Sequence, residues 1–312
     1  MLSSRISFTT RHPILVASVA TLLLAPAGCG GDDDGGGSAT TATETPRNEL
    51  AISSDAYTLQ PGEEKYFCYT SRLPKDKATV VTAFTPTYGP GTHHILLAQT
   101  LAPEQDGFFE CPVLFKTTWV PLYVGGVEST GVTLPEGAGV ALHEGQQVLL
   151  QLHLQNTTAS PITAKTAVAM ALAAEGAETI PAGIFGVDDR KIAVPPNAKE
   201  TTTETSCSTG REMDVYAMFG HMHKFGKRLE VTRTTDGADE SLLDQVWSFA
   251  DQPTTPVKFH LTAADTVKLR CTHANTTAKA LAYGESSDNE MCSVVFYYTP
   301  FDGLAGCIDV GD

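Results

Sequence analysis

From about Glu49 onward, the sequence is a succession of short apolar runs that proline and glycine interrupt every dozen residues or so. The runs are rich in Val, Thr, Tyr and Phe, which favour strands, and no long stretch has convincing helical periodicity. In order they are 78–84, 113–120, 147–154, 165–172, 214–219, 228–234, 244–249, 266–270 and 292–298. This spacing predicts an all-β chain built from antiparallel sandwiches.

A small polar break at residues 173–178 divides these runs into two series. Each side of the break is long enough to form a domain, because ordinary domains have roughly 100–200 residues. We therefore predict two tandem antiparallel β-sandwich domains, the first at 49–174 and the second at 175–312.

The first 48 residues predict export rather than a folded domain. Residues 1–29 contain two arginines, then an apolar run too short for a permanent membrane span, then small residues before Cys29, as in a bacterial lipoprotein signal peptide. Residues 30–48 are rich in Gly, Asp and Thr and predict a disordered tether, because they cannot bury a core. We expect lipidation at Cys29 and a lipid anchor at the bacterial cell envelope, periplasmic or on the outer surface. A plain secretory signal is the alternative.

The charge of the chain argues against one class of partner. Its formal net charge is −15, and it falls to −17 when the two leader arginines are removed. Binding to nucleic acid requires a basic face. We therefore expect no nucleic-acid partner.

Six cysteines remain after Cys29, and an even number in an exported chain favours disulfides. No CxxC pair is present, which disfavours a thiolate metal site. The sequence spacing alone leaves several pairings open.

Two histidines in the second series, His221 and His223, are two positions apart. On a strand their side chains share one face, since side chains alternate with period two. Met291, about 70 residues later, adds a thioether, and two imidazoles with a thioether suit copper in its reduced state. Met218 and Met222 occupy the opposite face, and we expect them to fill the core.

The first series contains a second group of histidines. His93 and His94 are adjacent, and adjacent side chains diverge on a regular strand. Both can bind one ion only where the backbone is irregular, which Gly89 and Gly91 just before them permit. His153 lies opposite the leucine face of its strand and supplies a third imidazole. Three neutral imidazoles suit copper or zinc.

Taken in order, His-His, Gln-x-His, His-x-His and Glu-Met-Cys resemble the copper type II ascorbate-dependent monooxygenases over about residues 66–307. The resemblance implies two sandwiches of jelly-roll type with two coppers per chain. The electron-transfer copper would bind His93, His94 and His153. The oxygen-activating copper would bind His221, His223 and Met291, which would be the catalytic residues. The implied disulfides are Cys68–Cys111, Cys207–Cys307 and Cys271–Cys292.

The implied activity is hydroxylation of an aliphatic C–H bond in a small-molecule substrate by O2, with ascorbate or another one-electron donor as reductant. In the peptide-amidating branch, an arginine, an asparagine and a tyrosine recognise the substrate where this chain has Phe219, Ser293 and Val295. With Tyr297 these form the candidate substrate-binding set, which contains no fixed cation. We therefore expect a rather apolar substrate, and a monomeric enzyme.

Two other functions compete with this interpretation. One is a non-catalytic copper-binding lipoprotein at the cell surface, used for storage, sensing or delivery. The other is a β-sandwich adhesion or binding module without metal. We interpret Asp288 and Glu290 as polar loop residues, and the histidines outside the two sets as surface or core groups.

Overall fold

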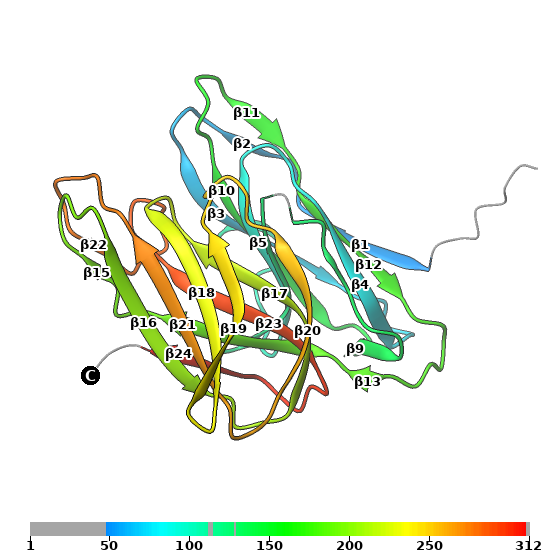
Figure 1. Cartoon of the computed structure of the whole chain (residues 1–312). Coiled ribbons are helices and arrows are strands. Elements are labelled where there is room, and N and C mark those ends of the chain that lie inside the picture. The colour runs from blue at the N-terminus through cyan, green and yellow to red at the C-terminus, as the bar shows by residue number, and fades with distance from the viewer. Residues whose placement is uncertain (1–47, 112–114, 128, 310–312) are drawn as a thin grey trace, which may run out of the picture. The chain divides into compact units, whose positions relative to one another are not determined.

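The computed structural model describes residues 48–111, 115–127 and 129–309, which form strands joined by turns and no helix (Figure 1). The predicted signal peptide, Cys29 and the tether up to Arg47 lie outside these residues. Within the described ranges, no helix has the length and hydropathy needed to cross a membrane. The all-β prediction is confirmed.

The first sandwich consists of two sheets. One has the order β1–β12–β4–β9–β13, spanning Glu49–Ser53, Ala167–Leu172, Thr79–Thr87, Ala138–Leu142 and Ile180–Pro181, and β8 (Val132–Thr133) pairs with β4. The other has the order β6–β3–β10–β5–β7, spanning Gly107–Glu110, Glu64–Arg72, Gln147–Gln155, Thr92–Thr100 and Trp119–Gly126. A separate pair joins β2 (Tyr57–Leu59) to β11 (Ile162–Ala164).

The second sandwich repeats this plan. One sheet has the order β20–β17–β23–β14–β24, spanning Thr254–Leu261, Met213–Met222, Cys292–Thr299, Gly183–Asp189 and Ala305–Asp309. The other has the order β16–β21–β18–β19, spanning Thr201–Ser208, Thr266–His273, Gly226–Thr235 and Ala238–Val246, and Figure 1 shows its four strands side by side. A further pair joins β15 (Ala193–Val194) to β22 (Leu281–Ala282).

Strand boundaries differ from the sequence prediction in one place near the site. The run at 113–120 was predicted as a strand, but residues 115–118 are not in a strand and β7 begins at Trp119. Residues 112–114 lie outside the described residues. The change from one sandwich to the other falls between β13, which pairs with β9, and β14, which pairs with β23.

Side chains alternate between the two faces of a strand, which places core residues on one face and the candidate site residues on the other. Leu150, Leu152 and Leu154 of β10 are fully buried in the first core, as predicted. Met218 and Met222 of β17 lie in the second core, also as predicted. The candidate histidines lie on β5, β10, β17 and the turn after β17, and they pack against each other across the two sandwiches, so they are buried as well.

Three disulfides hold the strands that carry the site. The structure joins Cys68 to Cys111, Cys207 to Cys307 and Cys271 to Cys292, the same pairs that the resemblance implies. The last two each connect the two sheets of the second sandwich. An unstrained disulfide typically contributes about 2–4 kcal/mol. Because disulfides persist in oxidising compartments, these three indicate an extracytoplasmic protein.

Candidate metal centre

A β-bulge brings His93 and His94 to one site. In the pairing of β5 with β10, His94 lies opposite His153 and Thr92 lies opposite Leu154, so His93 is an extra residue on β5. An extra residue shifts the alternation of the strand locally, which lets neighbouring side chains turn to the same side. The predicted irregularity before His94 is therefore present.

In the first histidine set, the Nδ1 atoms of the three rings lie close together. Nδ1 of His93 lies 3.2 Å from Nδ1 of His94, which lies 3.4 Å from Nδ1 of His153. One ligand atom from each residue falls within 4.8 Å of the others, and all three residues are buried. Three converging imidazole nitrogens form a cluster that can hold a single metal ion.

Glu64 of β3 fixes the orientation of His153. The Nε2 atom of His153 bonds Oε1 of Glu64 at 2.7 Å, which leaves Nδ1 free to face the metal site. Burial alone would raise the pKa of Glu64, but hydrogen bonds from His153 and Ser287 lower it to about 2. A carboxylate behind a histidine ligand is a recurrent feature of metal sites. The sequence analysis missed Glu64, because only the strand pairing brings it near His153.

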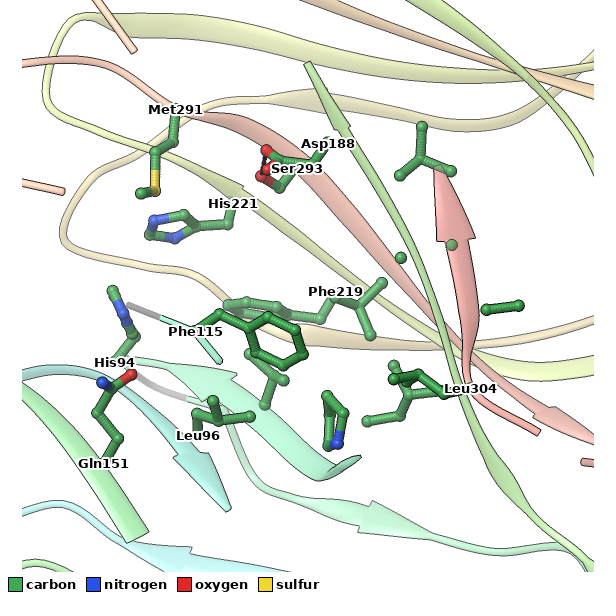
Figure 2. A pocket seen from close by; sticks show the side chains of 18 of the residues that line it. His94, Leu96, Phe115, Gln151, Asp188, Phe219, His221, Met291, Ser293 and Leu304 are labelled. Atoms are coloured by element: carbon green, nitrogen blue, oxygen red, sulfur yellow. Dashed lines mark hydrogen bonds between the residues drawn. The ribbon is translucent and has the colours of Figure 1, made fainter. Parts of the chain in front are cut away.

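In the second histidine set, the Nδ1 atoms are hydrogen-bonded and the Nε2 atoms have no partner. Nδ1 of His221 lies 2.8 Å from Oε1 of Gln252, and Nδ1 of His223 lies 3.2 Å from the carbonyl oxygen of Asn289. Both oxygens accept, so each ring carries its proton on Nδ1 and has a lone pair on Nε2. Both Nε2 atoms are buried without a hydrogen-bond partner. Figure 2 shows the sulfur of Met291 beside the ring of His221.

These unpartnered atoms fit a bound metal. A buried polar atom without a partner costs free energy, unless a ligand satisfies it. Two imidazole lone pairs beside a thioether are a donor set that suits reduced copper. The ring centroids of His221 and His223 lie 5.2 Å apart, and a second metal site at His221, His223 and Met291 stays a prediction.

Glu290 differs from its interpretation as a polar loop residue. It is fully buried, and its carboxylate accepts the backbone N–H groups of His223 at 3.2 Å and of Phe225 at 2.6 Å. It therefore holds the turn that carries His223 just past the end of β17. Asp288 does lie on the surface, with 82 % of its side chain exposed and an ion pair to Lys224.

We expect Glu290→Ala to destabilise the protein and weaken copper binding at the second site. The substitution leaves two buried backbone donors without a partner, which costs about 1–3 kcal/mol for each unsatisfied group. Thermal unfolding of the metal-free chain measures the loss. Asp288→Ala is the control, because an exposed ion pair contributes only about 0–1 kcal/mol. Equal melting temperatures for the two variants would contradict the assigned role of Glu290.

The histidines are held neutral. Burial, together with the neighbouring imidazoles, lowers the pKa of His93, His94 and His223 well below the usual range. Burial also lowers the pKa of His221 to about 4. Neutral imidazole is the form that binds a metal ion. At neutral pH these four side chains are therefore uncharged, as metal binding requires.

The same pKa shifts predict that acid destabilises the metal-free protein. Below about pH 6.5 the unfolded chain takes up protons at these histidines, whereas folded His221 does so only near pH 4. Lowering the pH between these values therefore favours unfolding, by about 1.4 kcal/mol per pH unit for His221 alone. Thermal unfolding at pH 7 and pH 5 measures the effect. A melting temperature that does not fall at pH 5 would contradict these pKa shifts.

The two histidine sets lie beside each other. The ring centroids of His94 and His221 are 4.8 Å apart, and those of His93 and His223 are 6.2 Å apart. Gln252 touches a member of each set, since its Nε2 lies 3.1 Å from Nε2 of His93. The sequence gives no signal for Gln252, which lies in the connection before β20.

A cavity of about 390 Å³ begins at these histidines and extends between the sandwiches (Figure 2). His94, His221 and Met291 lie on one side of it, and most of the remaining wall is apolar. Phe219 and Val295, and His221 and Ser293, are neighbouring pairs across β17 and β23. Phe219, Ser293 and Val295 of the candidate substrate set line the cavity.

Two polar features of this region depart from the expectation. Tyr297 is not among the lining residues, because its hydroxyl donates to the carbonyl oxygen of Val124 at 2.6 Å and joins β23 to β7. The cavity also contains a cation, Arg190, where none was expected. Its Nε donates to Oδ2 of Asp188 at 2.7 Å, so a carboxylate already neutralises it. Ser293 donates to the other oxygen of Asp188 at 2.6 Å.

One protein family matches the part of the chain that contains the second histidine set. Residues 180–312 match the family described as copper type II ascorbate-dependent monooxygenase, C-terminal domain. This part of the chain contains His221, His223 and Met291. Residues 180–312 are thus similar to a copper type II ascorbate-dependent monooxygenase domain, and the first sandwich carries the buried histidine triad.

Individual relatives are amidating monooxygenases. The chain is 26 % identical to the peptidyl-glycine alpha-amidating monooxygenase of Mus musculus, over 81 % of this chain and 28 % of that protein. It is 25 % identical to the enzyme of Rattus norvegicus, over 75 % of this chain and 25 % of that protein. The chain thus spans about a quarter of the length of these relatives.

Among solved structures, one similar chain comes from the triple jelly-roll fold and turret assembly of an archaeal virus. It is 8 % identical, with a TM-score of 0.24, over 78 % of this chain and 59 % of that one.

Proposed function

We propose that the protein is a dicopper monooxygenase that hydroxylates an aliphatic C–H bond of a small, apolar molecule. The observation that carries the proposal is one cavity with histidines of both sets and Met291 on one side and apolar residues around the rest. His93, His94 and His153 would hold one copper, and His221, His223 and Met291 the other. Copper at these sites would supply the two one-electron steps that the reaction requires.

The reaction places one oxygen atom of O2 in the C–H bond and releases the other as water. This consumes two electrons and two protons, and ascorbate is the proposed donor of the electrons. Glu64 contributes by fixing which ring nitrogen of His153 carries a proton, and Gln252 does the same for His221. The apolar wall contributes by excluding water and by holding the substrate against His221 and Met291.

The cavity favours a substrate without a carboxylate. Phe219 stands where the peptide-amidating branch has its substrate-binding arginine. Arg190, the cation on the wall, is already paired with Asp188. A carboxylate on the substrate would have to displace Asp188 from Arg190 while losing its own hydration, which is costly in a cavity of this kind. We therefore infer that acylglycines and glycine-extended peptides are poor substrates.

The proposed setting is the bacterial cell envelope. The signal peptide and Cys29 would provide a lipid anchor, and residues 30–48 a tether that leaves the folded part free to meet substrate and reductant. We propose a monomer, because each chain carries both histidine sets and the cavity between them.

Oxygen uptake coupled to product formation tests the proposal. The copper-loaded full chain would be supplied with ascorbate, O2 and a panel of small apolar molecules and acylglycines. We expect a hydroxylated product from an apolar member, with one O2 consumed per product. Copper binding without any product would favour the storage, sensing or delivery function instead. Efficient turnover of acylglycines would contradict the inferred substrate class.

Narrowing the cavity should exclude larger substrates. Gly186 of β14 lines the cavity, and a Cβ added there meets no heavy atom within 4 Å. We expect Gly186→Leu to raise KM for the larger substrates of the panel by about tenfold or more, since lost apolar contact is worth about 1–3 kcal/mol. Gly186→Ala should have a smaller effect, and copper content should not change. Equal KM values in both variants and the wild type would show that substrate binds elsewhere.

A further inference from the structure

Gln252 belongs to the second sandwich but is embedded in the first. Its backbone N–H donates to the carbonyl oxygen of Val127 at 3.0 Å, and its side chain is fully buried. A Cβ on Gly126 would approach the Cβ of Gln252 to 2.7 Å, so the end of β7 leaves room for this side chain. This packing presents the amide group of Gln252 to both histidine sets.

The amide has a defined orientation. Nε2 lies 3.1 Å from the carbonyl oxygen of Phe249, which can only accept a hydrogen bond, so the nitrogen must lie at that end. The same nitrogen lies 3.1 Å from Nε2 of His93, and Oε1 lies 2.8 Å from Nδ1 of His221. Gln252 therefore donates to His93 and accepts from His221.

These two bonds affect the histidines in opposite ways. His221 donates from Nδ1, and its Nε2 lone pair is free for a metal ion. His93 accepts at Nε2, so the neutral ring carries its proton on Nδ1. Nδ1 is the atom of His93 that faces Nδ1 of His94 at 3.2 Å, and it is therefore the atom that a metal ion in the first site needs.

We propose that Gln252 is a positioning residue that couples the two metal sites, an inference that rests on the proposed function. Gln252 holds the second site ready for copper and keeps His93 in the tautomer that does not bind at Nδ1. With copper in both sites, His93 presents Nε2–H and His221 presents Nδ1–H to an amide that has one acceptor. Rotating the amide would turn its oxygen toward the Phe249 carbonyl and its NH2 toward the His221 donor. Loading both sites therefore breaks one end of the bridge.

The first test needs no metal. Nitrogen-15 NMR of the metal-free full chain distinguishes the two neutral tautomers of each histidine. We expect both His93 and His221 to carry the proton on Nδ1, and Gln252→Leu to reduce that population for His93. A wild-type His93 with its proton on Nε2 would overturn the proposal.

The second test is a titration with Cu(I), followed by X-ray absorption, in which sulfur scattering reports the Met291 site. In the wild type we expect about one sulfur per copper after one equivalent of Cu(I), because the Met291 site fills first. After two equivalents we expect about half a sulfur per copper, because the first site has no sulfur ligand. Gln252→Leu should tighten the first site and weaken the second, each by about tenfold, the equivalent of one hydrogen bond. General damage to the fold would weaken both sites together.

Two further variants complete the test. Gln252→Glu offers a carboxylate that accepts from both rings, so both sites should bind copper at least as tightly as in the wild type. Gln147→Leu is the matched control, because Gln147 is buried and hydrogen-bonded far from the histidines, and it should leave the order of loading unchanged. Two bound coppers with wild-type affinities in Gln252→Leu would overturn this inference alone. No copper binding in any variant would overturn it together with the proposed function.

Discussion

Met291→Leu is expected to lower hydroxylated product formation by about 100-fold or more. Replacing a residue that only hydrogen-bonds to a metal ligand already costs about 10–100-fold in metal affinity or activity, and this substitution removes a ligand itself. Met291 is buried, faces the cavity beside His221, and is the thioether of the second donor set. A thioether favours the reduced state of copper, and leucine supplies no donor. Leucine also has nearly the volume of methionine, so the fold should be retained at a cost below about 1.5 kcal/mol.

Product per O2 consumed, measured together with copper content, checks this expectation. Met218→Leu is the matched control, since Met218 is fully buried on the same sandwich but packs in the core. The control should keep its activity and both coppers. Full activity in Met291→Leu would show that the second site is assigned to the wrong side chain.

His153→Ala is expected to remove the copper of the first site and to abolish coupled turnover. The three Nδ1 atoms of this site converge from β5 and β10, and two imidazoles alone leave the cluster incomplete. The change also frees Glu64, which keeps its bonds to Ser287 but loses its partner on the ring. We therefore expect a lower melting temperature in addition to the loss of one copper.

The control for this variant is His143→Ala, because His143 is exposed on the first sandwich and belongs to neither set. Copper content should fall from two to one per chain in His153→Ala and stay at two in the control. Retention of two coppers in His153→Ala would contradict the composition of the first site.

Local patterns in the sequence predict much of this site. Alternation along residues 150–155 separates the buried leucines from His153, and the same rule separates Met222 from His221 and His223. The glycines before His93 allow the irregular backbone that the structure has as a bulge at His93. These features depend on residues close together in the chain, so sequence periodicity is sufficient to find them.

The residues that were missed or interpreted differently from the sequence act across long separations. Glu64 reaches His153, Glu290 reaches the turn at His223, and Gln252 reaches His93. A single acidic or amide residue in a loop or at the end of a strand resembles any solvent-exposed group until strand pairing shows what it faces. Arg190 was missed for the same reason, because β14 is brought to the cavity by its pairing with β23.

Some strands were also missed or shifted. β16 reads TTTETSCS and is an edge strand of the four-stranded sheet, in which exposed residues alternate with half-buried or buried ones that are mostly polar. β19 was predicted at 244–249 but ends at Val246, and all of its residues are exposed or half-buried. Outer strands with few apolar residues give a weak signal, and their pairing with neighbours determines their boundaries.

The most direct test of the central claim is the copper content of the purified full chain after loading with copper and removal of excess, measured by elemental analysis. The account predicts two coppers per chain, falling to one in His153→Ala and to one in Met291→Leu. A chain that binds no copper, or that keeps both coppers in these variants, would contradict it.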